Sequence, residues 1–80
     1  MRVIVNVTLK SGVLDPAGKA TKHALNSLGF DSVNEVKIGK RIVLDIDEKK
    51  RKRAKKVAKK MCEELLANTV IENYKIKVKE

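Results

Sequence analysis

The sequence predicts a single small α+β domain, with elements in the order β-α-β-α-β along residues 1–80. Apolar and polar residues alternate over 2–10 and again over 74–79, which is the period of a half-buried strand. Two stretches with helical spacing lie between them, separated by a longer alternating stretch, 33–46. We therefore expect an antiparallel sheet with both helices on one of its faces and a long second strand, bent or split.

Length and composition limit the class of protein. A domain near 80 residues removes only about 60% of its unfolded surface from water, so it gains stability from association. No apolar stretch is long enough to span a bilayer, and Asn6 and Thr8 interrupt the apolar run that a signal peptide needs. The lone Cys62 forms no internal disulfide and fits a reducing compartment. We expect a cytoplasmic protein with no membrane partner.

The first helix has clear start and stop signals. Asp15 is placed to accept hydrogen bonds from free backbone N–H groups, and Pro16 sits where its missing donor costs nothing. Gly29 suits the left-handed residue that follows many helices, and Phe30 is expected to fold back on Leu25. The stripe expected to be buried in this helix, residues 16–28, consists of Ala17, Ala20, Ala24 and Leu28.

The stretch 33–46 is longer than the strands beside it. Residues of one parity are apolar, with Lys40 as the single interruption: Val36, Ile38, Ile42, Leu44 and Ile46. A continuous strand here would run about 45 Å, more than its neighbours can cover. A hairpin at Gly39-Lys40 would give the ferredoxin-like order βαββαβ, but it breaks the parity. The parity favours a continuous or bent strand whose free half pairs with another chain, which predicts an obligate oligomer.

The whole net charge of +9 lies in one segment. Residues 49–60 hold nine of the 19 basic residues and none of the ten acidic ones, so the remainder is balanced. The apolar residues in and after this segment recur at helical spacing: Ala54, Val57, Ala58, Met61, Cys62 and Leu65. Asp47 is the expected N-cap, with Glu48 at the positive end of the helix dipole. We interpret the charge as the solvated face of a helix, with anion binding as a secondary use.

A helix end, a stop and a closing strand follow. Leu65 and Leu66 finish the apolar stripe, and Asn68 is expected to adopt the left-handed conformation that ends many helices. The strand residues expected to face the core are Tyr74, Ile76 and Val78, which alternate with Lys75, Lys77 and Lys79.

No catalytic set is recognisable. His23 is the one histidine, and no carboxylate, serine or cysteine pairs with it on sequence grounds. No metal-ligand spacing and no glycine-rich nucleotide loop occur. The run Gly39–Arg41 can grip a phosphate, but a solvated bend explains it equally well. We expect no autonomous enzyme activity, and no metal or cofactor bound by this chain alone.

Two binding modules are the alternatives. A small basic RNA-binding α+β module would explain the charge, but such sheets use aromatic stacking platforms. This chain has one Phe and one Tyr, assigned to a helix cap and the last strand, so nucleic acid is not an expected partner. A ligand-sensing regulatory module of the ACT type is the other contrast, and a small effector bound at a dimer interface would favour it.

Four blocks, in order and spacing, resemble the PurS family, the small subunit of bacterial and archaeal phosphoribosylformylglycinamidine (FGAM) synthase. They are Leu9–Gly18 (LKxGVLDPxG in the family), Ala24–Gly29 (ALxxLG), Val33–Lys40 (VxxVxxGK) and Cys62–Tyr74 (CEELLANPVIEDY). Thr69 stands where the family has Pro, and Asn73 where it has Asp. The first departure loosens the turn into the last strand, and the second removes one charge contact.

The resemblance implies an accessory role in purine biosynthesis. In the family's complex a glutaminase subunit releases ammonia, and a synthetase subunit uses ATP to activate the amide that ammonia then attacks. The small subunit is a homodimer, or a tetramer, that bridges the two and assists ammonia transfer. ATP, Mg and glutamine therefore belong to the complex and not to this chain.

Three short segments are the candidate contact surface for these partners: Lys10–Asp15, Gly39–Arg41 and Asn68–Tyr74. Short loops with fixed polar residues often serve binding. The candidate residues are Lys10, Gly12, Asp15, Gly39, Lys40, Arg41, Asn68 and Tyr74. Caps and turns explain Asp15, Gly39 and Asn68 equally well.

Overall fold

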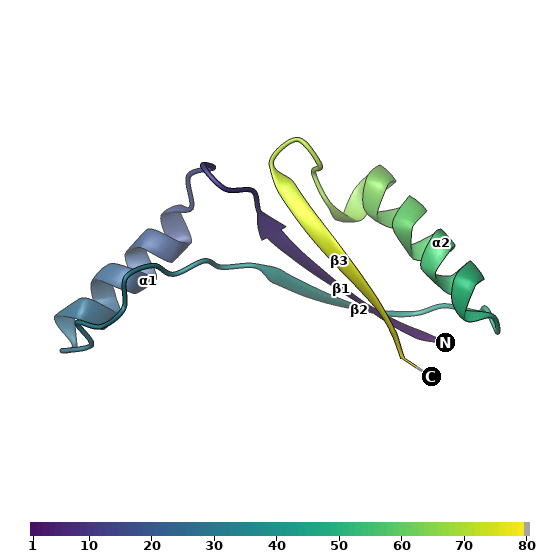
Figure 1. Cartoon of the computed structure of the whole chain (residues 1–80), viewed down its shortest axis with the longest axis horizontal. Coiled ribbons are helices and arrows are strands. Elements are labelled where there is room, and N and C mark those ends of the chain that lie inside the picture. Colours follow the sequence, from purple (N-terminus) through teal and green to yellow (C-terminus); the bar gives the residue numbers. More distant parts are fainter. Residues whose placement is uncertain (80) are drawn as a thin grey trace.

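The computed structural model describes residues 1–79 and alternates strands with helices, as the sequence predicts (Figure 1). The elements are β1 (Arg2–Leu9), α1 (Pro16–Ser27), β2 (Lys40–Asp45), α2 (Arg51–Met61), a single π-helical turn (Cys62–Leu66) and β3 (Glu72–Lys79). No helix among these residues is long and apolar enough to cross a membrane.

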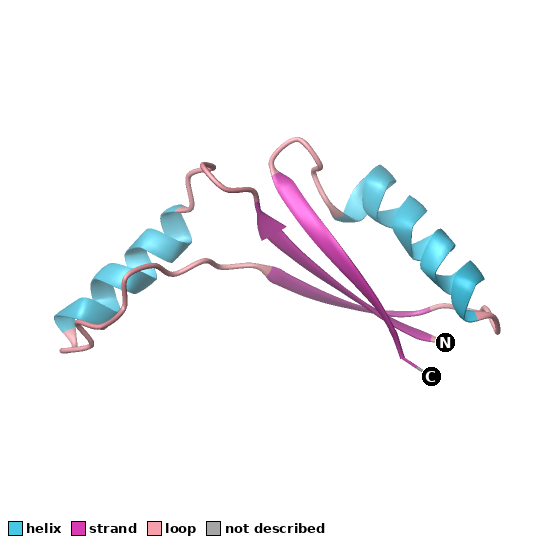
Figure 2. Ribbon diagram, in the orientation of Figure 1, coloured by secondary structure: helices cyan, strands magenta, loops and turns pink. Residues whose placement is uncertain are grey.

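The three strands form one antiparallel sheet in the order β2-β1-β3, with β1 at its centre (Figure 2). Val5 lies opposite Ile42 on one side and Ile76 on the other, so apolar residues of the three strands share a face. The α+β class and the antiparallel sheet expected from the sequence are confirmed.

The core lies between this face and α2. The small residues Ala54 and Ala58 let the helix approach the sheet closely, and Cys62 continues their stripe into the π-helical turn. The buried cluster consists of Val3, Val5, Val7, Ile46, Ala54, Ala58, Cys62, Ala67 and Val78. The thiol of Cys62 is a buried small hydrophobe, as expected, and its burial raises its pKa.

The position of α1 differs from the expectation that both helices cover one face of the sheet. Only α2 packs on the sheet, whereas α1 lies beside the segment that leads back to β2 (Figure 1). Its expected apolar stripe is exposed, and Leu28 is 74% accessible. The physical reason is that α2, an 11-residue helix, and the π-helical turn already cover the apolar face of the sheet, which leaves no room there for α1.

The molecule is elongated as a result. Its radius of gyration is 15.9 Å, against about 12 Å for a compact domain of this length, and its extents are 48 × 26 × 14 Å. Such a shape leaves a large share of the apolar surface uncovered. The ten large apolar side chains that remain exposed include Leu28, Phe30, Ile38, Leu65 and Val70.

The long middle stretch does not fold into a hairpin. Only Lys40–Asp45 pairs with β1, and residues 33–39 before it form no strand within the described chain. The ferredoxin-like alternative, which needs a fourth strand in the sheet, is therefore wrong. Pairing starts at Lys40 because its partner strand is close to its end: Lys40 lies opposite Val7, and β1 stops at Leu9.

The start of α2 is also later than expected. Asp47 is not the N-cap; the helix begins at Arg51, and the capping position holds Lys50, whose side chain makes no capping bond. The reason lies just upstream, where both backbone groups of Ile46 are hydrogen-bonded to Met1. Its N–H donates to the Met1 carbonyl at 2.9 Å, and its carbonyl accepts from the Met1 amino group at 2.7 Å. The chain therefore stays extended through Ile46 and needs the next residues to turn.

Gly18 is the point where α1 meets the returning chain. A Cβ at this position would collide with the Val36 carbonyl oxygen and lie 2.7 Å from Asp15 Oδ2. Alanine gains up to about 1 kcal/mol of helix propensity, but overpacking against backbone costs about 1–3 kcal/mol. We expect Gly18→Ala to lower the free energy of unfolding by about 1 kcal/mol in urea titrations. Lys19→Ala, at the next and exposed position, is the control, and an equal loss there would contradict the argument.

Candidate functional site

The three candidate segments meet at one end of the sheet. The Lys10 N–H donates to the Ile71 carbonyl at 2.8 Å, which ties the connector after β1 to the loop before β3. The Ile38 N–H donates to Asp15 Oδ2 at 3.0 Å, and Lys40 Nζ lies 3.9 Å from Glu72 Oε2. We call residues 10–15, 39–41 and 68–74 together the three-loop end.

Asp15 holds two segments together. Its Oδ1 accepts from the Gly18 N–H at 2.8 Å, which confirms the expected helix cap, and its Oδ2 accepts from the Ile38 N–H. These two bonds favour the ionised carboxylate, so they lower the pKa of Asp15, with the bond from Ile38 as the larger cause. Gly12, earlier in the same connector, has a φ of +85°, a value that few residues other than glycine adopt.

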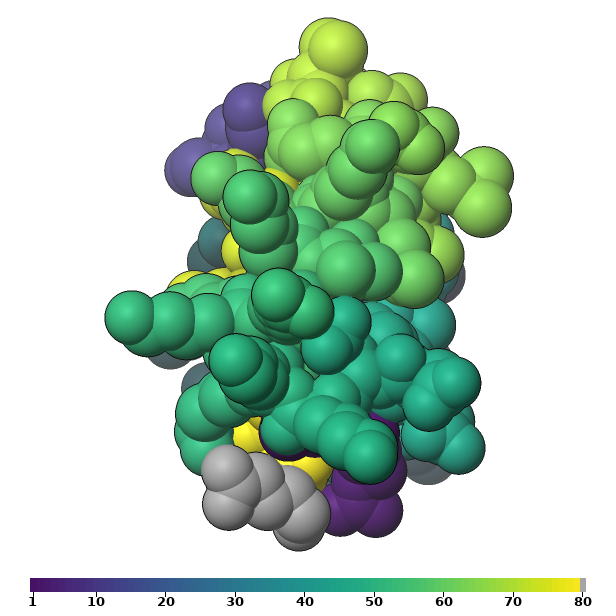
Figure 3. Space-filling view, turned by 90° about the vertical axis from the view of Figure 1, so that its right-hand side faces the viewer, coloured from purple at the N-terminus to yellow at the C-terminus, as the bar shows by residue number. Residues whose placement is uncertain are grey.

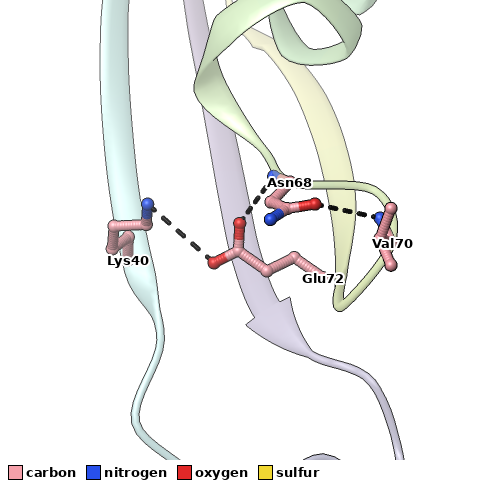
Figure 4. A network of polar contacts seen from close by, with 4 residues as sticks. All are labelled: Lys40, Asn68, Val70 and Glu72. Carbon is pink, nitrogen blue, oxygen red and sulfur yellow. Dashed lines mark hydrogen bonds and ion pairs between the residues drawn. The ribbon is translucent and has the colours of Figure 1, made fainter.

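The loop before β3 closes around a second carboxylate (Figure 4). Glu72 Oε1 accepts from the Asn68 N–H at 2.7 Å, and Asn68 Oδ1 accepts from the Val70 N–H at 3.2 Å. The expected left-handed Asn68 is wrong, because no described residue other than glycine has a positive φ. The helix ends instead through the π-helical turn and extended Ala67, and Asn68 makes a side-chain turn.

Glu72 is the residue that sequence reasoning missed. Its second oxygen faces Lys40, whose side chain is 61% exposed while that of Glu72 is only 16% exposed. An ion pair with so much solvent around its ammonium adds little stability, so Glu72 serves mainly to hold the loop. The sequence offered one signal for this role: Glu72 lies four residues after Asn68, at the start of the last strand.

Gly39 and Arg41 flank Lys40 and differ in role. A Cβ on Gly39 would lie 2.6 Å from the Val7 carbonyl oxygen, so the residue is a point of close approach between the bend and β1. Arg41 is exposed and lies opposite Asn6, on the face of the sheet that α2 does not cover. Only the side chains of Lys40 and Arg41 are therefore available from this segment for a partner.

Tyr74 lies apart from the polar loop contacts. Its hydroxyl donates to Glu63 Oε2 at 2.6 Å, which ties β3 to the π-helical turn. That hydrogen bond to a carboxylate is the main reason why the pKa of Tyr74 is raised to about 12. The tyrosine therefore supports the end of the helix, and its ring is half-buried against the core.

The Tyr74 bond gives a testable pH dependence. An unfolded tyrosine loses its proton near pH 10 and the folded one near 12, so the unfolded state loses its proton first. The stabilisation is complete below pH 10 and is lost between pH 10 and 12. Because Tyr74 is the only tyrosine, and the chain has no tryptophan, tyrosinate absorbance reports it directly. We expect Glu63→Ala to move the midpoint towards 10, while Glu64→Ala leaves it near 12; equal midpoints in all three proteins would contradict the assignment.

Two hollows adjoin the three-loop end. One of about 540 Å³ is lined by Asn6, Thr8, Lys10, Thr69, Glu72, Asn73, Tyr74 and Lys75. The other, of about 450 Å³, lies between the connector, the start of α1 and residues 34–37, and Asp15 is on its wall. Neither holds a catalytic arrangement, and residues 1–79 contain no group of three His, Cys, Asp or Glu placed to hold a metal ion. His23 is exposed on α1.

The sequence of this chain is similar to one family of known proteins. The chain matches the PurS family, described as phosphoribosylformylglycinamidine (FGAM) synthase, over residues 2–80. It is 49% identical to the phosphoribosylformylglycinamidine synthase subunit PurS of Bacillus subtilis over 79 residues, which cover 99% of this chain and 93% of that protein.

Solved structures are similar over almost the whole chain. The PurS crystal structure from Methanocaldococcus jannaschii superposes with a TM-score of 0.89 at 42% identity and covers 99% of this chain and 95% of that one. A chain in the PurLQS structure from Thermotoga maritima gives 0.86 at 32% identity, with 95% and 93% covered. The resemblance expected from the four sequence blocks is confirmed, and the chain belongs to the PurS family of phosphoribosylformylglycinamidine synthase.

Proposed function

We propose that this chain is the small, non-catalytic subunit of FGAM synthase in purine biosynthesis. As a homodimer it bridges the glutaminase and the synthetase subunits and assists the passage of ammonia between them. Its relatives carry the name of that subunit, and one similar chain occurs in a structure named PurLQS. The reaction's ATP, Mg and glutamine bind to the other subunits, in the cytoplasm.

One observation supports the homodimer, namely the half of the middle stretch that pairs with no strand. Residues 33–39 run extended beyond the sheet with no strand partner in the described chain, and Ile38 is 45% exposed. An unpaired apolar edge of this kind invites a second chain. A second copy that pairs there would also cover the apolar stripe of α1, so both exposed features have one explanation.

The three-loop end is the proposed docking surface for the larger subunits. Hydrogen bonds of Lys10 and Asp15 join its segments to one another, and the bond of Asn68 to Glu72 holds the loop before β3. Lys40 and Arg41 project exposed charges from it. Rigid loops with protruding charged groups are suited to recognition, because little conformational entropy is lost on binding.

Reconstitution tests the proposal. The three subunits from the same source are mixed, and glutamine-dependent FGAM formation is measured with and without this chain. We expect omission to abolish glutamine-dependent activity while ammonia, supplied directly, still supports the synthetase. Full glutamine-dependent activity without this chain would overturn the bridging role. Loss of the ammonia-dependent reaction as well would assign the chain to the synthetase chemistry instead.

A further inference from the structure

The outer face of α2 carries an unusual concentration of charge. The helix buries Ala54 and Ala58 against the sheet, and its remaining surface is basic. The side chains on it are all exposed; they are Lys52, Arg53, Lys55, Lys56, Lys59 and Lys60, here called the basic face. Figure 3 looks onto the side of the molecule where α2 lies, and the green segment covers much of that view.

Acidic residues do not compensate this face. None of the ion pairs found among residues 1–79 involves it. No ion pair joins Lys59 to Glu63 or Lys60 to Glu64, although each acid lies four residues after its lysine, and Glu63 accepts from Tyr74 instead. The first turn of α2 holds no acid, so several positive charges crowd the positive end of the helix dipole.

This arrangement is unfavourable in the free chain. Like charges four residues apart, such as Lys52 and Lys56, repel one another on a helix, and positive charge at the N-terminus opposes the dipole. A solvated helix face needs charged residues, but both signs serve that purpose equally well. A bound polyanion would relieve both costs, which points to a ligand and not to solubility alone.

We propose that the basic face of α2 binds the phosphodiester backbone of double-stranded nucleic acid without sequence preference. From Lys52 to Lys60 the helix rises about 12 Å. A duplex carries about one negative charge per 3.4 Å along each strand, so the same length holds about three or four phosphates of the strand nearest the helix. The six basic side chains on this face are enough to contact all of them.

The residue types favour this ligand over others. Lysine supplies five of the six positions, and it contacts phosphate as a compact point charge without the fixed bidentate geometry of arginine, which fits contact that does not depend on sequence. No aromatic side chain lies on the face, since Phe30 follows α1 and Tyr74 is on β3. Base stacking is therefore absent, and backbone contact without sequence readout remains.

An anionic membrane is the weaker match. A helix that lies on a membrane inserts an apolar face beneath its charges. Here the central apolar stripe of α2 is buried against the sheet, and only Val57 and Met61, 37% and 36% exposed, remain beside the basic face. The inference does not depend on the proposed role in FGAM synthase.

Fluorescence anisotropy with the full chain tests the site. The probes are a labelled RNA duplex and a DNA duplex of mixed sequence, titrated at several salt concentrations from about 50 mM upwards. We expect micromolar dissociation constants that rise steeply with salt and hardly change when the sequence is scrambled. The triple variant Lys52→Gln, Lys56→Gln, Lys59→Gln is expected to bind about tenfold more weakly, with a salt slope smaller by about 0.9 per lysine removed.

A matched variant separates a local site from net charge. Lys19→Gln, Lys37→Gln, Lys75→Gln removes the same charge from exposed positions outside α2, and it should retain the affinity within about twofold and the salt slope of the unaltered chain. An equal loss in both triple variants, or no duplex binding at about 50 mM salt, would overturn the proposal. Tighter binding to phosphatidylserine vesicles than to either duplex would also overturn it, in favour of a membrane surface.

Discussion

Replacing Ile38 with lysine is expected to dissociate the proposed homodimer into monomers. Full burial of an isoleucine side chain is worth about 1.5–3 kcal/mol, and 45% of Ile38 is exposed in the single chain, so each copy loses about 0.7–1.4 kcal/mol. In a two-fold dimer every substitution occurs twice. The dissociation constant should therefore rise by about 10- to 100-fold, before any cost of burying the two charges.

The isolated chain should tolerate this change. The only described bond of Ile38 is made by its backbone N–H, to Asp15, and a lysine side chain leaves that donor in place. Sedimentation velocity over a range of concentrations gives the dissociation constant, and circular dichroism reports whether the fold is kept. We expect a folded monomer.

Leu65→Lys is the matched control for this experiment. Leu65 is 84% exposed on the π-helical turn, away from the free edge of residues 33–39. It should leave the dimer intact. The opposite result, with Leu65→Lys dissociating the chain and Ile38→Lys leaving it assembled, would move the interface to the α2 side of the molecule.

Local signals in the sequence predicted the elements well where the cause was also local. Asp15 and Gly29 correctly marked the start and the end of α1, because a cap and a left-handed glycine act within one turn of the helix. The Gly29 N–H donates to Asn26, and the Phe30 N–H to Leu25, which is the expected end of that helix. Alternation placed β1 and β3 for the same reason, since a strand's faces follow from its own residues.

The errors came from contacts between distant segments. Asp47 is a good cap by type, but the bonds between Met1 and Ile46 keep the chain extended past the point where a helix would start. The position of α1 away from the sheet could not be read from its apolar stripe, because a stripe does not reveal what covers it. Glu72 likewise gains its role only when the loop closes on Asn68.

The candidate site was predictable as a set of segments but not as an arrangement. Turn chemistry selected the three loops separately, and nothing in the spacing indicated that they meet at one end of the sheet. Their meeting follows from the antiparallel register, in which the end of β1 at Leu9 lies opposite the start of β3 at Glu72. The start of β2 at Lys40 lies opposite Val7, two positions before Leu9 in β1.

Reversing the charges of Lys40 and Arg41 to glutamate is expected to weaken binding of the synthetase subunit by at least about tenfold, which is typical for charged groups that guide and fix a protein interface. The two side chains are exposed and project from a backbone held at Gly39 by close contact with Val7. Pull-down with the purified large subunit, followed by titration calorimetry, measures the loss.

The design must separate docking from damage to the loop, because Lys40 also faces Glu72. Lys40→Gln removes the ion pair without placing two carboxylates together, and the exposure of its ammonium implies a loss of stability below about 1 kcal/mol. Lys75→Glu with Lys77→Glu makes the same charge change on exposed residues of β3. If the bend docks the synthetase, the reversed Lys40 and Arg41 lose binding, Lys40→Gln loses part of it while the fold is kept, and the protein changed at Lys75 and Lys77 binds like the unaltered chain. Unchanged assembly in the reversed protein would remove the bend from the docking surface. The surface would then consist of the connector after β1 and the loop before β3.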